Sequence, residues 1–304
     1  MNEANTVLMR PTASGTRREI ELTFKRLIRN KGATLGALIL LVVVAAAIFS
    51  AQITPHDPTF RDIARRLKPP LYQQDGQLFL LGTDAVGRDI LSRIIYGTRI
   101  TLMVGLASVF FAGSIGVLIG LLSGYLGGWF DTLAMRIADI QLAIPFMVLA
   151  IAVAAVLGNS LTNTIIVLGI TGWVTYGRLV RSETLSVRRN EYVTAAEASG
   201  VQPARIVFRH ILPNVGASII VAATQMVARM LIAEASLSFL GLGIPFTTPT
   251  WGVMIAEGRD YLMTSWWVST LPGLAIFLTV MSANLVGDWL RDITDPRQQM
   301  ARLV

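Results

Sequence analysis

The residues of this sequence that could do chemistry are ionisable side chains placed within or beside long apolar runs. They are Arg136, Asp139, Arg229, Glu234 and Asp288. A charged side chain at the centre of a membrane costs about 2.5–3.5 kcal/mol on insertion scales, so each should face protein or water. Glu234 is the most deeply placed. It could line a translocation path or carry protons, or it could hydrogen-bond to a neighbouring helix. Arg136 and Asp139, three residues apart on one helix face, are expected to pair.

The sequence lacks the motifs that make or break covalent bonds. It has no cysteine and only two histidines, His56 and His210, which lie far apart in the chain. Thiolate chemistry is therefore absent and a histidine metal centre is not expected. No Gly-Lys pair exists to form a phosphate-binding loop, and the HExxH and G-x-S-x-G patterns are also missing. We predict no catalytic residue, no metal site and no cofactor in this chain.

The composition predicts an all-α integral membrane protein. Hydrophobic residues make up 53% of the 304 residues and charged residues only 15%, whereas soluble domains carry about a quarter charged residues. Apolar runs in lipid must satisfy their own backbone hydrogen bonds, and the alternation typical of barrel strands is absent. The net charge of +7 comes without a nucleic-acid-binding motif, so we expect membrane lipid and no nucleic acid as partner.

Six apolar runs approach the roughly 20 residues that cross a bilayer. They cover residues 33–53, 99–123, 133–157, 162–181, 214–238 and 267–290. Six spans place both termini on one side, and the basic residues of the leader, of the 178–209 segment and of the tail make that side cytoplasmic. Residues 1–32 are interpreted as a cytoplasmic amphipathic segment, with a disordered basic tail as the alternative, and residues 291–304 as a cytoplasmic tail.

Residues 54–98 form a long outer loop in this topology. Its proline-punctuated first part is expected to be irregular. The stretch RDILSRIIYG predicts an interfacial helix that leads into the second span, with Asp89 and Arg93 spaced to pair at i,i+4.

Within the second span, three glycines recur every four residues and share one helix face. They are Gly116, Gly120 and Gly124. Small residues at this spacing let another helix approach closely. We favour a helix-packing face over a simple bend of the helix.

A polar stretch, EYVTAAEASGVQPARIVFRHILPN at residues 191–214, separates the fourth and fifth apolar runs. Asn190 is a possible N-cap for a short helix, and Gly200 followed by Pro203 is the usual order of signals that end one. A second helical segment follows it. The small alanines of the first helix could fit a cleft on a partner, and an ordinary amphipathic loop is the alternative.

The spacing of this stretch resembles the EAA loop of ABC importer membrane subunits. Ala195-Ala196, Gly200 and Leu212-Pro213 match the loop's fixed positions, while Thr194 stands where glutamate is usual and His210 where isoleucine is usual.

The resemblance extends along nearly the whole chain. Four segments resemble the C-type permease subunits of dipeptide, oligopeptide and nickel importers, in the correct order. They are LGTDAVGRDILSRIIYGTRI, GYLGGWFDTLAMRIADIQLAIPF, EASLSFLGLGIP and GDWLRDITDPR. The family implies a type I ABC importer permease fold, with a core at residues 99–290 that contains the EAA loop and its cytoplasmic coupling helix.

The resemblance also implies partners and contact residues. The chain would form half of a heterodimeric pore with a second homologous permease. Two ATPase subunits would bind ATP and magnesium, and an extracytoplasmic binding protein would deliver the cargo at the bacterial inner membrane. The ATPase-coupling residues would be Glu191, Tyr192, Thr194, Ala195, Ala196, Gly200, Leu212 and Pro213.

Other functions remain to be weighed. The main rival is an ion-driven secondary transporter that uses Glu234 or Asp139 as a proton site. An intramembrane protease would need a nucleophile and a base that the sequence does not supply. Within the ABC interpretation, dipeptides or oligopeptides are the expected cargo, with nickel chelates, glutathione and other small solutes as alternatives.

Overall fold

The computed structural model describes residues 25–294, so residues 1–24 and 295–304 lie outside the described part of the chain. Most of the predicted amphipathic leader and most of the predicted tail fall there. Within the described part of the leader, residues 25–29 are helical, and Asn30 caps the next helix by accepting a hydrogen bond from the Ala33 backbone N–H at 3.0 Å.

Four helices between residues 25 and 294 are long and apolar enough to cross a membrane. They are α2 (Lys31–Ile48), α4 (Ile90–Leu126), the continuous run Pro203–Phe239 that ends in α10 (Leu212–Phe239), and α12 (Trp267–Thr294). A bent pair of helices makes a fifth candidate. Helix α7 (Leu161–Arg188), which matches the fourth predicted span, is not among them. The count of six spans therefore stays a prediction.

The predicted span at 133–157 is wrong as a single helix. Helix α5 (Gly128–Leu142) and helix α6 (Phe146–Leu157) are bent by 93° at the intervening break. Pro145 lies in this break, where it has no N–H to continue the first helix and disfavours helical geometry at the residue before it. The sequence LAIPF carried this signal.

Helix α4 is longer than the sequence predicts. The expected interfacial helix at residues 90–95 and the expected span at 99–123 form one helix of 37 residues. Asp89 caps its start by accepting a hydrogen bond from the Ser92 backbone N–H at 2.9 Å. With no proline inside it, the helix continues for roughly 55 Å at 1.5 Å per residue.

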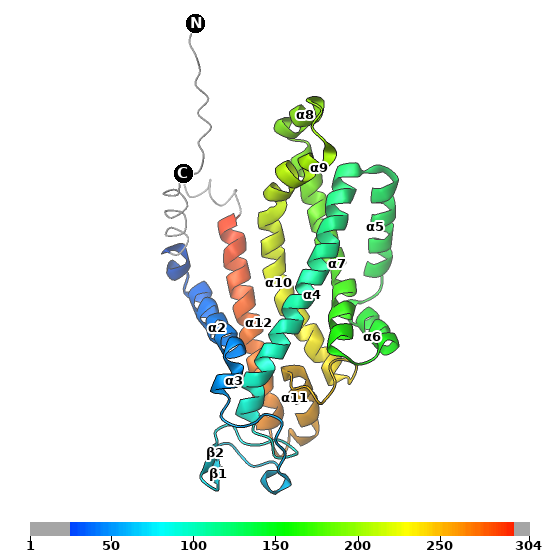
Figure 1. Ribbon diagram of the computed structural model, residues 1–304. Coiled ribbons are helices and arrows are strands. Elements are labelled where there is room, and N and C mark those ends of the chain that lie inside the picture. Colours follow the sequence, from blue (N-terminus) through cyan, green and yellow to red (C-terminus); the bar gives the residue numbers. More distant parts are fainter. Residues whose placement is uncertain (1–24, 295–304) are drawn as a thin grey trace.

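The two ends of the molecule differ in structure (Figure 1). Helix α8 (Glu191–Ala198) lies at one end, close to the connection between α4 and α5. The opposite end holds the β-hairpin and helix α11 (Trp251–Gly258). Between these ends, α2 packs along α12, while α4 lies against α7 and α10. The chain is thus an elongated helical bundle with a different surface at each end.

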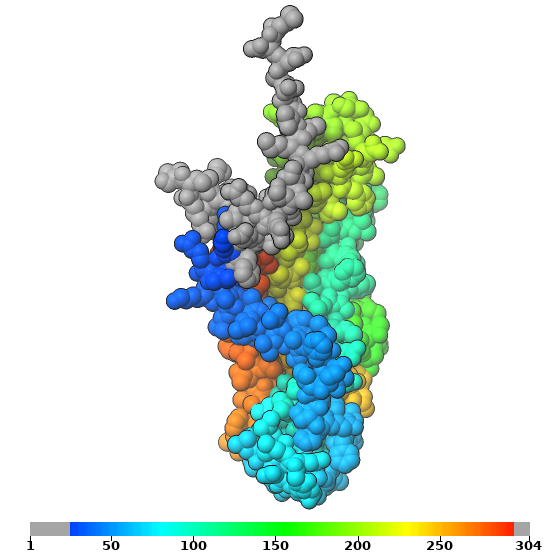
Figure 2. All heavy atoms as spheres, turned by 60° about the vertical axis from the view of Figure 1, so that its left-hand side comes forward, coloured from blue at the N-terminus to red at the C-terminus, as the bar shows by residue number. Residues whose placement is uncertain are grey.

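The outer loop closes the end opposite α8. Helix α3 (Ser50–Ile53) follows α2, and the loop then contains η1 (Ile63–Arg65) and an antiparallel hairpin of β1 (Tyr72–Gln74) and β2 (Gln77–Phe79). In the hairpin, Tyr72 is paired with Phe79. Figure 2 shows the loop, coloured light blue to cyan, covering this end of the bundle on the face that is drawn.

The three glycines at four-residue spacing lie where α4 meets α7. A Cβ at Gly120 would lie 2.7 Å from the carbonyl oxygen of Gly177, and one at Gly124 would lie 2.6 Å from the Thr184 Cβ. At Gly116 a Cβ would lie 2.5 Å from the Tyr176 Cβ. Real Cβ atoms do not come this close, so the two helix backbones approach each other only because these positions are glycine.

Candidate functional site

Helix α8 is held to the bundle by one buried side chain. Val193 is fully buried, whereas most of the helix is exposed. It belongs to a core cluster that also contains Leu121, Val180 and Ile211. Because these residues come from α4, α7 and the segment before α10, α8 packs against several elements of the bundle at once.

Arg188, in the last turn of α7, ties α8 to α4. Its Nη1 donates a hydrogen bond to the Tyr125 carbonyl oxygen at 2.5 Å, and its guanidinium lies 5.0 Å from the centroid of the same residue's ring. Its Nε lies 3.5 Å from the carboxylate of Glu197. An arginine used in this way gives directional contacts that a lysine could not reproduce.

The outer face of α8 is exposed. Tyr192, Thr194 and Ala195 are exposed, and Ala196 is half-buried. Gly200 has φ +76° and nothing within 4 Å of a Cβ added to it, so the helix ends in the left-handed conformation that its sequence predicts. Asn190 precedes the helix as predicted, but its side chain forms no capping hydrogen bond.

A π-helical turn lies between α8 and α10. After α9 (Pro203–Ile206), segment η2 (Val207–Ile211) is a π-helix, and the Leu212 N–H donates back five residues to the Val207 carbonyl oxygen. Pro213 has no N–H to donate and its ring would clash with the carbonyl four residues earlier in a regular helix. The Leu-Pro pair therefore explains why a π turn lies here.

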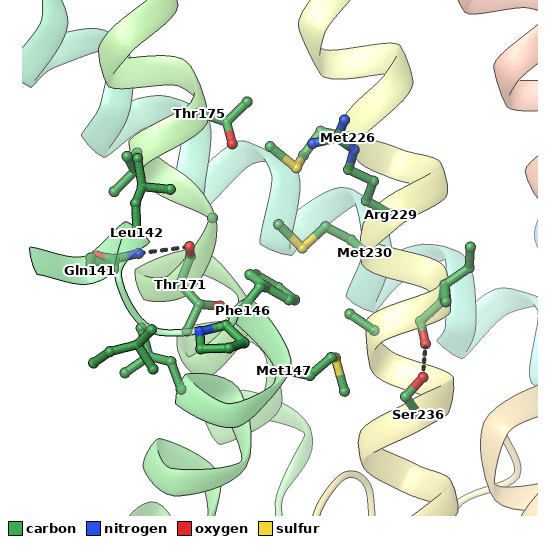
Figure 3. Close-up of a pocket in the computed structure, with 17 residues that line it drawn as sticks. Gln141, Leu142, Phe146, Met147, Thr171, Thr175, Met226, Arg229, Met230 and Ser236 are labelled. Carbon is green, nitrogen blue, oxygen red and sulfur yellow. Dashed lines mark hydrogen bonds between the residues drawn. The ribbon is translucent and has the colours of Figure 1, made fainter. Parts of the chain in front are cut away.

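A cavity of about 520 Å³ opens between the α5–α6 break, α7 and α10. Figure 3 shows Met147 from α6, Thr175 from α7, and Met226, Arg229 and Met230 from α10 around it. Its volume is within the usual range for small-molecule sites, and its wall is mostly apolar. Arg229 is the only charged side chain among the described residues that line it.

Glu234 does not line this cavity. It is fully buried, and its Oε1 accepts hydrogen bonds from the hydroxyls of Ser238 at 2.9 Å and Thr250 at 3.1 Å. Thr250 caps α11, so the carboxylate joins α10 to the start of that helix. This geometry matches the helix-bonding alternative, and a role in a translocation path stays a prediction.

The expected pairing of Arg136 with Asp139 is wrong. Asp139 pairs with Arg178 of α7, and Arg181 of the same helix donates from Nε to Asp131 at 2.5 Å. Both acids of α5 therefore face the neighbouring helix α7. Spacing within one helix could not reveal these contacts, because they depend on how the two helices pack.

A buried charge cluster lies at the end opposite α8. Arg88 donates from Nε to Asp84 at 2.6 Å and from Nη2 to Glu257 at 2.9 Å. Arg93 donates from Nη1 to Asp84 at 2.5 Å and lies 2.7 Å from Glu257. The expected pairing of Arg93 with Asp89 is therefore wrong. Each arginine here has two carboxylates as partners.

The cluster ties the outer loop to α11. Burial favours the neutral form of Arg88, but the nearby Asp84 and Glu257 carboxylates outweigh this effect and raise the pKa of Arg88. Sequence analysis missed the cluster, although the density of charges in TDAVGRDILSR was a usable signal. Nothing in the sequence indicated Glu257, which is 169 residues from Arg88. Within residues 25–294, no group of three or more acidic or histidine side chains could hold a metal ion.

These features define a class of protein: a bundle of membrane-spanning helices with a short exposed helix at one end and a cavity inside. The family model of the binding-protein-dependent transport system inner membrane component matches residues 116–300. A second model, the N-terminal transmembrane domain of oligopeptide transport permease C, matches residues 20–70. The chain therefore belongs to the family of binding-protein-dependent transport permeases. It is a multi-pass inner-membrane subunit of an ABC transport system rather than a catalytic enzyme.

Several relatives match this chain over most of their length. The chain is 44% identical over 275 residues to a di/tripeptide transport system permease of Pseudomonas aeruginosa, covering 90% of both chains. It is 40% identical to a probable D,D-dipeptide transport permease of Escherichia coli, covering 86% of both. It is 39% identical to a glutathione transport permease of Pectobacterium atrosepticum, covering 90% of both.

A solved structure shares the fold. An inward-facing structure of the MetNI methionine ABC transporter matches with a TM-score of 0.53 at 21% identity, covering 67% of this chain and 97% of the other. This likeness concerns the arrangement of the helices and carries no information on cargo.

Proposed function

We propose that this chain forms half of the translocation pore of an ATP-driven importer for short peptides. The relatives described above are named for di- and tripeptides, D,D-dipeptides and glutathione, which are all small peptides or peptide-like molecules. The chain's membership in a binding-protein-dependent family favours this reading over an ion-driven secondary transporter. A second homologous permease, two ATPase subunits and an extracytoplasmic binding protein complete the proposed complex.

The observation that carries the proposed mechanism is the attachment of α8. Its outer face is exposed and includes small side chains such as Ala195, while Val193 and Arg188 fix its inner face to α4, α7 and the start of α10. A helix of this kind can enter a groove on an ATPase and pass the movement of that subunit to the bundle. ATP and magnesium would be bound by the ATPases.

The charges at the α8 end support the proposed orientation. Basic residues gather there from several segments, namely Lys31, Arg188, Arg189, Arg205, Arg209 and Arg291. Positive residues in loops are retained on the cytoplasmic side, which is also the side where ATP is available. We therefore assign the α8 end to the cytoplasm, together with both termini, and the outer loop to the side of the binding protein.

The test uses the complete transporter, co-expressed and reconstituted in liposomes. Wild type should co-purify with its ATPases and take up a radiolabelled dipeptide only with ATP and binding protein. Ala196→Arg places a bulky cation on the docking face of α8, and should abolish ATPase association and uptake while membrane insertion persists.

The matched control is Ala64→Arg, the same change at an exposed position of η1 at the opposite end. It should retain ATPase association. Normal association and uptake in Ala196→Arg would refute the coupling role of α8. Uptake that survives ATP depletion and stops with an uncoupler would refute ATP-driven transport itself.

A further inference from the structure

We propose that Arg229 binds the carboxylate terminus of the peptide as it passes through the cavity between α6, α7 and α10. This inference rests on the proposed function, because it names the chemical group of the cargo that the cavity would recognise. Peptides of any sequence share this carboxylate. A site that transports varied peptides therefore gains from one fixed cation beside walls that adapt to different side chains.

The position of Arg229 along α10 is the first argument. Helix α10 extends from Leu212 to Phe239, which places Arg229 roughly 25 Å from its start and roughly 15 Å from its end at 1.5 Å per residue. Arg229 is thus well inside a candidate membrane span. A guanidinium there is costly in lipid and normally faces water or a protein partner.

The absence of a partner is the second argument. Arg229 is exposed, and it forms no hydrogen bond or ion pair with any residue between 25 and 294. The nearby acid on the same helix, Glu234, is fully buried and bonded to Ser238 and Thr250. The described lining of the cavity contains no acidic side chain. The cation therefore lacks a counter-charge among residues 25–294, and a carboxylate entering the cavity would supply it.

The walls of the cavity are the third argument. Met147, Met226 and Met230 line it beside Arg229 (Figure 3). Methionine is unbranched and polarizable, so a surface built from it can repack around ligands of different shape. The residues at 226, 229, 230 and 233 share one face of α10. The helix thus presents one cation and two adaptable apolar side chains to the same space.

The cavity volume of about 520 Å³ suits a short peptide, because small-ligand sites measure roughly 300–1,000 Å³. A guanidinium binds a carboxylate through two parallel hydrogen bonds, which fixes orientation as well as charge. The rival occupant is an acidic side chain of the second permease subunit. That rival predicts a contact needed for assembly, whereas our proposal predicts a contact needed only for transport.

The experiment compares Arg229→Gln, Arg229→Lys and wild type in the complete reconstituted transporter with its binding protein. Arg136→Gln is the matched control, since Arg136 is an exposed arginine of α5 that does not line the cavity. Three quantities are measured: co-purification of the subunits, ATP hydrolysis stimulated by loaded binding protein, and dipeptide uptake. Uptake is also measured with a C-terminally amidated peptide that the binding protein is first shown to bind.

Arg229→Gln should assemble normally and hydrolyse ATP, but take up the dipeptide about tenfold more slowly. Arg229→Lys should recover part of the rate, and Arg136→Gln should match wild type. The preference of wild type for free acid over amide, at saturating binding protein, should fall toward one in Arg229→Gln. Wild type and Arg229→Gln are supplied by the same binding protein. A change in the ratio of free-acid to amide uptake is therefore caused by the permease.

Uptake by Arg229→Gln at the wild-type rate, or with the wild-type preference for free acid, would overturn the proposal and leave the proposed function intact. Loss of subunit co-purification in Arg229→Gln would overturn it in favour of a contact between the two permeases. Failure of wild type to take up any peptide, despite stimulated ATP hydrolysis, would instead refute the proposed function.

Discussion

Arg88 Nη2 lies 2.9 Å from both carboxylate oxygens of Glu257, and this contact joins the outer loop to α11 across 169 residues of sequence. Asp84 forms ion pairs with both Arg88 and Arg93, so the four side chains make one cluster. Removal of one charge from such a cluster leaves another buried without compensation. The outer loop is therefore fixed to the bundle by this buried charge cluster.

Glu257→Gln should lower the stability of the permease by about 3–5 kcal/mol, because it leaves two buried guanidinium groups with fewer negative charges. Thermal unfolding of the purified protein in detergent measures this loss. Asp75→Asn is the control, since it breaks the contact of Arg65 with a carboxylate that is 70% exposed, and exposed pairs contribute about 0–1 kcal/mol. Equal unfolding temperatures for the two variants would contradict the structural role of the cluster.

The contribution of Arg88 should not depend on pH in the physiological range. Its pKa is raised in the folded protein, so its stabilisation is fully present below the unfolded pKa and is lost only as pH rises through the still higher folded value. Unfolding temperatures of wild type and Arg88→Met should therefore differ by the same amount at neutral and mildly alkaline pH. A difference that shrinks over that range would contradict this assignment.

Gly120→Ala should destabilise the contact of α4 with α7 by about 1–3 kcal/mol, as expected for overpacking. Its new Cβ would lie 2.7 Å from the Gly177 carbonyl oxygen, and backbone cannot move aside cheaply. Gly113→Ala on the same helix is the control, because its Cβ would lie 3.6 Å from the Tyr176 ring, an ordinary contact. Unfolding in detergent should separate the two variants, and similar stabilities would show that the close approach is not required.

The sequence predicted more about the elements than about their contacts. Helix-ending signals at Gly200 and the packing spacing of the α4 glycines are local, so a reading of the chain could find them. The bend at Pro145 was also a local signal and was missed, because the apolar run on either side suggested one span. The charge cluster and the Arg178–Asp139 pair depend on packing between distant segments. They could not be found from spacing within one helix.

Pro213→Ala should replace the π turn by regular helix, since the alanine N–H can donate to the carbonyl four residues earlier. Such a change alters the rotation of η2 and α8 relative to α10. Dipeptide uptake should fall several-fold while ATP hydrolysis continues, because the changed orientation of α8 would disturb its proposed coupling to α10. Pro203→Ala at the start of α9 is the control and should have little effect, since proline there only replaces an unpaired N–H. Unchanged uptake in Pro213→Ala would contradict a role for the π turn.

Two substitutions of Gly200 can distinguish the effect of backbone strain from the effect of added bulk at the end of α8. Its φ of +76° favours glycine, yet nothing lies within 4 Å of an added Cβ, so Gly200→Ala should cost about 1 kcal/mol through strain alone. Asparagine tolerates this conformation, so Gly200→Asn should keep the stability of the permease and add bulk only on the proposed docking face. We expect both variants to remain folded, with Gly200→Asn more defective in ATPase association than in thermal unfolding. Gly216→Ala, at an open position of α10 without positive φ, should leave association unchanged. If Gly200→Asn binds the ATPases as wild type does, the open surface after α8 is not part of the docking face.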